Sequence, residues 1–197
     1  MDDEREVRVL PGPEKGTLRL LDRETYEPIV VDTDDGAAGA ADLQPGYLLD
    51  TRLDWSDPDP VLEAFMLHRP TLYAFADGID PVFELAQDVW QVAKANGDGM
   101  NSRVTRNTDG EVNGVCYVFA ENSMDDLFEE FRTGARPLEP LVDRINERED
   151  PAPREVFVLR PEGGEFVIVT IALQKNGHFA ETLRETYERE YVAEPLA

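Results

Sequence analysis

The chain has few basic residues and very little lysine. Its 197 residues include 42 acidic and 19 basic side chains, which gives a formal net charge of −23. Lys15, Lys94 and Lys175 are its only lysines, and the other basic residues are arginines. Concentrated salt screens the repulsion between carboxylates, so this composition is typical of proteins adapted to molar salt. We therefore expect a halophilic protein with an acidic surface.

Long hydrophobic runs and cysteine pairs are also missing. No segment approaches the roughly 18 apolar residues of a membrane span, and the first residues lack the basic and apolar parts of a secretion signal. Cys116 is the single cysteine, which excludes an intrachain disulfide framework and a paired-cysteine metal site. Because 41% of the residues are hydrophobic and 9% aromatic, disorder is excluded as well. These features predict a folded, cytoplasmic protein that does not enter the membrane.

The motifs of the common catalytic classes are absent. The chain has no glycine-rich phosphate loop, no nucleophile elbow and no HExxH pair. With His68 and His178 as its only histidines, a multi-histidine metal site is excluded, and we interpret both as surface or capping residues. Cys116 lies in an apolar run, where cysteines are usually buried and inert. We expect no metal and no cofactor, and leave open whether any reaction is catalysed.

The first part of the chain has the pattern of an all-β domain. Short apolar runs alternate with turn residues over residues 6–75, which predicts strands at 7–10, 17–22, 28–32, 47–53, 61–67 and 71–75. So many short strands in so few residues bury their edges most simply by closing. The prediction is a small antiparallel β-barrel, similar to an OB fold, over residues 1–76.

The second part mixes helical and strand patterns. Asp80 and Pro81 can begin a helix that Gly97 ends, strands are predicted at 101–107 and 112–120, and two helices follow. A hairpin at 155–174 precedes a last helix at about 178–190. Residues 77–197 are therefore predicted to form an antiparallel sheet with helices mainly on one face, so the whole chain has an α+β fold.

The densest polar cluster lies between Gly97 and Gly110. It provides five candidate ligand-binding residues: Asn101, Arg103, Thr105, Arg106 and Asn107. Arginine binds phosphate and carboxylate groups through two parallel hydrogen bonds, so the cluster could hold an anionic ligand. The alternative is a charged edge strand that ends in a tight Asp109-Gly110 turn. The segment that follows does not fit a calcium loop, because Ala120 stands where the loop needs glutamate.

A small barrel also raises the question of nucleic acid. Barrels of this kind bind single strands with aromatic side chains in a positively charged groove, and Tyr47 and Trp55 could stack on bases. The strongly negative chain argues against this, and phosphate-driven binding weakens steeply as salt rises. We interpret these aromatics as core residues, so nucleic acid is the least favoured partner.

Several segments resemble an uncharacterised family of haloarchaeal proteins, described as a domain of unknown function. The segments that carry this resemblance are residues 43–50, 53–57, 100–106, 109–110, 126–132, 137–141 and 153–157. The resemblance spans most of the chain and implies a halophilic, cytosolic protein. It implies no activity and no site residues.

Three functions follow as hypotheses. The first is a non-enzymatic binding or interaction module that recognises a protein partner or an anionic small ligand through Arg103 and Arg106. The second is an enzyme with a site between the two halves that acts on an anionic small molecule. The third is a barrel protein associated with RNA or DNA.

Overall fold

The computed structural model describes residues 3–122 and 124–187, and these residues form an α+β fold. They divide into two compact units. Unit 1 combines residues 3–72 with residues 130–151, and unit 2 combines residues 73–129 with residues 152–187. The chain therefore leaves unit 1, builds part of unit 2, returns to unit 1 and then completes unit 2.

Unit 1 contains a five-stranded antiparallel sheet, which we call sheet 1. Its strands are β1 (Asp3–Pro11), β2 (Thr17–Asp22), β3 (Pro28–Asp32), β4 (Leu48–Asp54) and β5 (Val61–Arg69), in the order β3-β2-β1-β4-β5. The inner face carries alternate residues of these strands, as expected for a sheet with one buried face. They form a core of Val7, Val9, Leu20, Val31, Leu49, Leu53 and Leu62.

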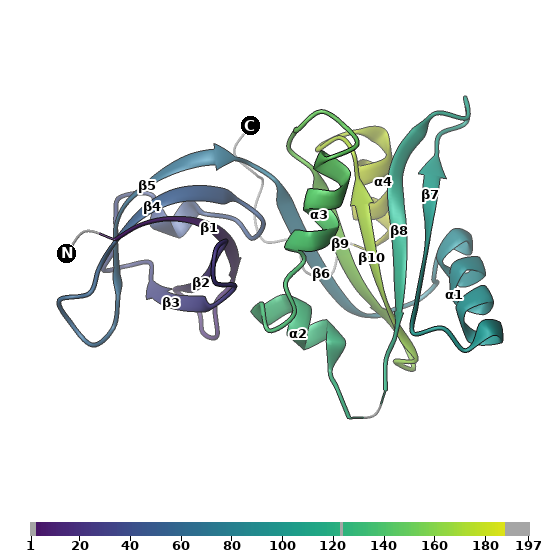
Figure 1. Cartoon of the computed structure of the whole chain (residues 1–197), viewed down its shortest axis with the longest axis horizontal. Helices are drawn as coiled ribbons and strands as arrows, with labels where there is room; N and C mark the ends of the chain where they lie inside the picture. The colour runs from purple at the N-terminus through teal and green to yellow at the C-terminus, as the bar shows by residue number, and fades with distance from the viewer. Residues whose placement is uncertain (1–2, 123, 188–197) are drawn as a thin grey trace. The chain divides into compact units, whose positions relative to one another are not determined.

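A closed barrel is not found in the described residues. Sheet 1 curls strongly (Figure 1), but no ladder joins its end strands β3 and β5. The connection from β3 to β4 supplies Ala40, in the short helix η1 (Ala40–Asp42), and Leu43 to the same core. Its Ala37 N–H also donates to the carbonyl of Leu62 in β5 at 2.7 Å. A loop thus covers the core where the predicted barrel would have needed another strand pairing.

The sixth predicted barrel strand belongs to the other sheet. It is β6 (Leu72–Ile79), the end strand of the five-stranded sheet 2 of unit 2. The other strands are β7 (Met100–Arg106), β8 (Val112–Ala120), β9 (Glu155–Pro161) and β10 (Phe166–Ala172). Figure 1 shows them side by side in the order β6-β9-β10-β8-β7.

Sheet 2 is mixed rather than wholly antiparallel. The β7–β8, β8–β10 and β10–β9 ladders are antiparallel, as the sequence predicted. At the other end, the Glu162 N–H donates to the Ile79 carbonyl at 3.0 Å, and Arg160 contacts Asp77. Residues 77–79 therefore run in the same direction as residues 160–162, which makes β6 and β9 parallel neighbours.

Two helices cover one face of sheet 2. They are α1 (Glu84–Asn96) and α4 (His178–Thr186), and their apolar residues form a core with strand residues of that face. This core includes Val89, Trp90, Ala180 and Leu183 from the helices, and Cys116, Val118, Phe157 and Ile168 from the strands. Helix α1 begins three residues after the predicted Pro81 and ends at Gly97, whose φ of 70° suits glycine. The predicted end of the last helix, at 190, lies outside the described residues.

The remaining helices connect and complete the units. Helix α2 (Leu127–Thr133) spans the point where the chain passes from unit 2 to unit 1. Helix α3 (Glu139–Asn146) belongs to unit 1, although its sequence lies far from the strands of sheet 1. Just before it, Gly134 adopts a φ of 86°, and a Cβ there would lie 2.8 Å from Leu10 Cδ1. This close approach fixes the returning segment against the outer face of sheet 1.

Candidate functional site

The five predicted ligand-binding residues lie on β7 or directly after it. Strand β7 is the end strand of sheet 2, and it pairs with β8 from Met100, opposite Phe119, to Arg106, opposite Val112. A strand in this position leaves every second N–H and C=O without a partner strand. The predicted site is therefore an exposed sheet edge, and its residues differ in what they contact.

Asn101 and Asn107 are held by the fold. The Asn101 side chain donates to the Val89 carbonyl of α1 at 3.2 Å and accepts the N–H of Ser102 at 2.9 Å. The Asn107 side-chain oxygen accepts the N–H groups of Asp109 and Glu111, at 3.0 and 2.9 Å. Asn101 fixes β7 on the helix, and Asn107 closes the hairpin turn.

Thr105 is buried, and its hydroxyl donates to Asn113 Oδ1 at 2.6 Å. The space around it is crowded, because a Cβ on Gly114 would lie 2.8 Å from the Thr105 hydroxyl oxygen. Gly114 is its register partner on β8. Thr105 thus joins the two strands of the hairpin, and its hydroxyl is engaged within the hairpin.

The two arginines point to opposite faces of β7. Arg103 lies opposite Cys116, which faces α1. The ladder shifts register between Thr105 and Arg106, where β8 has one extra residue, so alternation along β7 itself still puts Arg106 on the other face. Arg106 donates to the Gly110 carbonyl at 2.8 Å. In the part of the chain that the structure describes, the exposed Arg103 guanidinium has no hydrogen bond or ion pair. A ligand that contacts both arginines would have to lie along the outer edge of the strand.

The surface around β7 differs from the rest of this acidic chain. Residues 99–108 and 112–120 contain no aspartate or glutamate. Met100, Val104 and Val112 are between 38% and 46% exposed, which is high for large apolar side chains. This exposed strand therefore combines apolar side chains with two arginines and carries no carboxylate of its own. We call residues 100–106, with Val112, the β7 edge.

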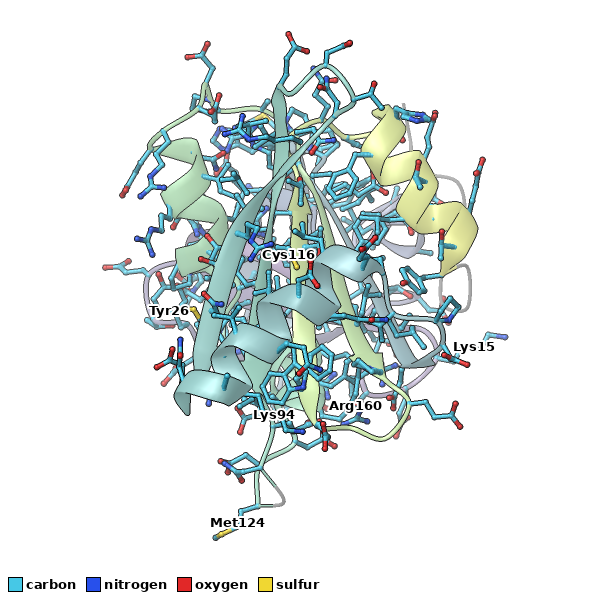
Figure 2. All side chains as sticks on the ribbon, turned by 90° about the vertical axis from the view of Figure 1, so that its right-hand side faces the viewer. Lys15, Tyr26, Lys94, Cys116, Met124 and Arg160 are labelled. Atoms are coloured by element: carbon cyan, nitrogen blue, oxygen red, sulfur yellow. The ribbon has the colours of Figure 1, made fainter. Side chains whose placement is uncertain are left out.

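Cys116 lies beneath this edge, within sheet 2 (Figure 2). Burial raises the pKa of its thiol to about 11. The thiolate is the reactive form of cysteine, so a thiol with this pKa is inert near neutral pH. The structure thus agrees with the structural role that the sequence predicts for Cys116.

A second charged cluster, in unit 1, has no counterpart in the sequence prediction. Arg8 of β1 is buried and forms a bidentate ion pair with Glu139 of α3, with Nε–Oε1 at 2.8 Å and Nη2–Oε2 at 2.9 Å. Its Nη1 donates to the Gly46 carbonyl at 2.9 Å. Arg23 contacts the same Glu139 carboxylate and also Asp143, at 3.2 Å. These four residues form a network that fixes α3 on sheet 1.

The charges in this network stabilise one another. Burial lowers the pKa of Arg23, but Glu139 and Asp143 outweigh this effect and raise its pKa above the ordinary value. Strand alternation alone predicts Arg8 on a solvent-facing surface together with Glu4 and Glu6. The sequence contains no local signal for its partner, because Glu139 lies 131 positions away.

Strands β1, β4 and β5 of sheet 1 also line an open hollow of about 540 Å³. It is lined by Glu4, Arg5, Glu6, Asp50, Thr51, Arg52, Ala64, Phe65 and Met66. Arg5 is already paired with Asp3 and Asp22, and Arg52 with Glu63. The hollow therefore offers carboxylates whose positive neighbours are largely engaged elsewhere.

Comparison with known proteins places nearly all of the chain in one family. The model of a family of unknown function, DUF6663, matches residues 1–193. The chain belongs to this family. No curated protein matches it. The match supports the prediction of a domain of unknown function, and it assigns no role to any residue of this DUF6663 chain.

A further arginine of this DUF6663 protein forms hydrogen bonds to more than one carboxylate. Arg160, labelled in Figure 2, donates to both oxygens of Asp77 at 2.7 and 2.6 Å and to Asp126 at 2.7 Å. Its guanidinium also lies 4.9 Å from the centre of the Phe128 ring. These contacts hold the pKa of Asp77 below its usual value. Arg160 is thus a structural link between β9, β6 and the start of α2.

Within residues 3–122 and 124–187, none of the helices is long and apolar enough to cross a membrane.

Proposed function

We propose that this DUF6663 protein is a non-enzymatic interaction module, and that the β7 edge binds an extended, acidic segment of a protein partner as an added strand. The observation that carries the proposal is the exposed, acid-free β7 edge with an arginine on each face. Addition of a strand to a free sheet edge is a common mode of peptide recognition, in which backbone hydrogen bonds supply affinity and side-chain contacts supply specificity.

The position of the two arginines favours an extended ligand over a compact one. Successive side chains of a strand point to opposite faces of its sheet. An added strand with acidic side chains on both faces would therefore reach Arg103 on one face and Arg106 on the other. Because Asn101 already accepts the N–H of Ser102, we expect pairing to begin after Ser102, around Val104.

Apolar contact would supply part of the binding. Charges are screened within roughly 3 Å at 1 M salt, so a protein that works in brine gains little from distant electrostatic attraction. Val104 and Val112 offer apolar surface at the same edge, and burial of such surface does not depend on screening. This combination is suited to binding in concentrated salt.

The halophilic, cytoplasmic setting is part of the proposal and rests on the net charge of −23. Repulsion among carboxylates acts over roughly 10 Å in dilute salt and is screened in molar salt. We expect a cooperative thermal transition in molar KCl and a large loss of structure in dilute buffer, both followed by circular dichroism. A melting temperature that is the same in both solutions would refute the halophilic assignment.

The binding proposal can be tested by tagged capture from a high-salt lysate of the source cells, with and without nuclease. The test variant is R103E/R106E, and the control is R144E/R148E, which reverses two exposed arginines of unit 1 and changes the net charge equally. We expect the wild-type and control proteins to retain a stoichiometric protein after nuclease treatment, and the test variant to lose it.

The other outcomes contradict the proposal in different ways. Equal capture by all three proteins would place the interaction away from the β7 edge. Partners that disappear on nuclease treatment would favour the nucleic-acid alternative. A solitary protein would favour a small anionic ligand, and the enzymatic alternative with it.

A further inference from the structure

Three side chains that can bind metal ions meet on the outer face of sheet 1. Glu6 on β1 lies directly opposite Asp50 on β4 in the strand register. His68 comes from the neighbouring strand β5, where the register shifts: Leu48 pairs with Arg69 and Leu49 with Leu67. His68 is thus the extra residue of a β-bulge, a feature that redirects side chains and is common beside functional sites.

The distances within this group are short. His68 Nδ1 lies 3.3 Å from Glu6 Oε2 and 3.9 Å from Asp50 Oδ2. One ligand atom from each residue lies within 4.8 Å of the other two. All three side chains are between a third and a half exposed, so they can adjust by a few tenths of an ångström without disturbing the core.

The fold leaves this group short of positive charge. Carboxylates directly opposite each other on neighbouring strands destabilise a sheet. Arg23 contacts the other carboxylate oxygen of Glu6, Oε1, at 3.4 Å. Among the described residues, Asp50 has no ion-pair partner other than His68. Two carboxylates thus face each other across the strands, with an imidazole nitrogen close to both.

We propose that Glu6, Asp50 and His68 bind a divalent transition-metal ion through Oε2, Oδ2 and Nδ1. The sequence predicts no metal, because it has neither several histidines nor a cysteine pair; this site needs one histidine and two carboxylates. It lies in unit 1 and does not depend on the function proposed for the β7 edge. The bound ion would neutralise the facing carboxylates and join strands β1, β4 and β5.

The geometry is close to that of known metal sites. Zinc lies about 2.1 Å from nitrogen and oxygen ligands, which places two ligands of a tetrahedral ion about 3.4 Å apart. The Glu6–His68 distance already meets this value, and Asp50 needs to approach His68 by about half an ångström. Glu6 and Asp50 also line the open hollow, which leaves room for water at the remaining positions.

The ligand set selects the class of metal. Imidazole favours zinc, cobalt and similar ions, whereas Mg²⁺ and Ca²⁺ prefer oxygen ligands alone. Ordinary carboxylates on an acidic protein bind cations weakly and without histidine. Dependence on His68 therefore distinguishes the proposed site from diffuse binding to the surface.

The test is titration of the full chain with Co²⁺ in molar KCl, followed by visible absorption and by the imidazole NMR signals. Because His68 and His178 are the only histidines, the two signals report on the site and on a reference position. We expect one equivalent of Co²⁺ to bind with saturation, and to shift or broaden the His68 signal but not that of His178. A large excess of Mg²⁺ should not displace the ion.

Variants complete the test. Loss of an outer partner of a metal ligand already costs 10–100-fold in affinity, so E6Q, D50N and H68Q, which alter direct ligands, should each weaken Co²⁺ binding at least about tenfold. The matched control H178Q should bind as the wild-type protein does. Unsaturable binding, equal broadening of both histidines, or wild-type affinity in H68Q would overturn the proposal.

Discussion

Replacement of Glu139 by glutamine should destabilise unit 1 strongly. Glu139 is fully buried and accepts two hydrogen bonds from Arg8, which is 2% exposed, and a third from Arg23. The E139Q side chain keeps the shape and one acceptor oxygen but removes the negative charge. Arg8 then stays buried without a compensating carboxylate at its Nε and Nη2 atoms.

The expected loss is about 3–5 kcal/mol in the free energy of unfolding, the cost of breaking a buried ion pair by removal of one partner. Urea unfolding in molar KCl measures it without adding a charged denaturant. The control is E147Q, which changes an exposed glutamate just after α3 and should stay within about 0.5 kcal/mol of the wild-type protein.

A loss below about 1 kcal/mol for E139Q would refute this reasoning, because a surface ion pair would give that result. The double variant R8M/E139M adds a second criterion. Replacement of a whole buried ion pair by apolar residues is often neutral or stabilising, so this variant should recover much of the stability that E139Q loses. An equal loss of unfolding free energy in E139Q and R8M/E139M would show that the shape of these side chains, and not their charge, determines the stability at this position.

Two further perturbations test other contacts. G134A should lower the free energy of unfolding by about 1–3 kcal/mol more than G110A does, as measured by urea unfolding. Both glycines have φ near 85°, but only at Gly134 would the new Cβ collide with Leu10. Equal losses would show that the core can adjust. D77N should weaken the rise of stability with pH below about pH 4. The pKa of Asp77 is lowered beside Arg160, so ionised Asp77 stabilises the fold above its unfolded-state pKa, and this stabilisation is lost as pH falls through the lower folded-state pKa. An unchanged dependence of unfolding free energy on pH would contradict this.

Local patterns predicted the elements well. Alternating apolar residues gave the strands 17–22 and 28–32 with the bounds that β2 and β3 have, and Gly97 marked the end of α1. The α+β class follows from these elements and is confirmed. Each of these features depends on residues that are close together in the sequence, where side-chain periodicity and glycine conformation are decisive.

The assembly of the strands and helices depends on contacts between residues far apart in the sequence, so local patterns could not predict it. Residues 71–75 have the pattern of one more barrel strand, yet they pair with β9, which is more than 80 positions later. Periodicity shows which face of a strand is apolar but not which sheet the strand joins. The inward-facing Ala40 and Leu43 lie in a glycine-rich segment without periodicity, so their place in the core had no sequence signal either.

The candidate site shows the same difference between features that depend on local residues and features that depend on distant contacts. The alternative prediction of an edge strand with a tight turn came from local residues, and β7 is an edge strand whose turn is closed by Asn107. The binding roles of Arg103 and Arg106 stay predictions. The Arg8–Glu139 pair and the Glu6–Asp50–His68 group were missed, because their members come together only through strand register and a returning helix.

The return of the chain to unit 1 has a consequence for synthesis on the ribosome. All five strands of sheet 1 emerge before residue 70, but the carboxylate that neutralises Arg8 follows 131 positions after it. Translation adds about 5–20 residues per second, so Glu139 is synthesised several seconds after the last strand of sheet 1. During that interval Arg8 must stay hydrated, so we expect sheet 1 to remain loosely packed until α3 has left the exit tunnel, and the two units to mature almost together at the end of translation.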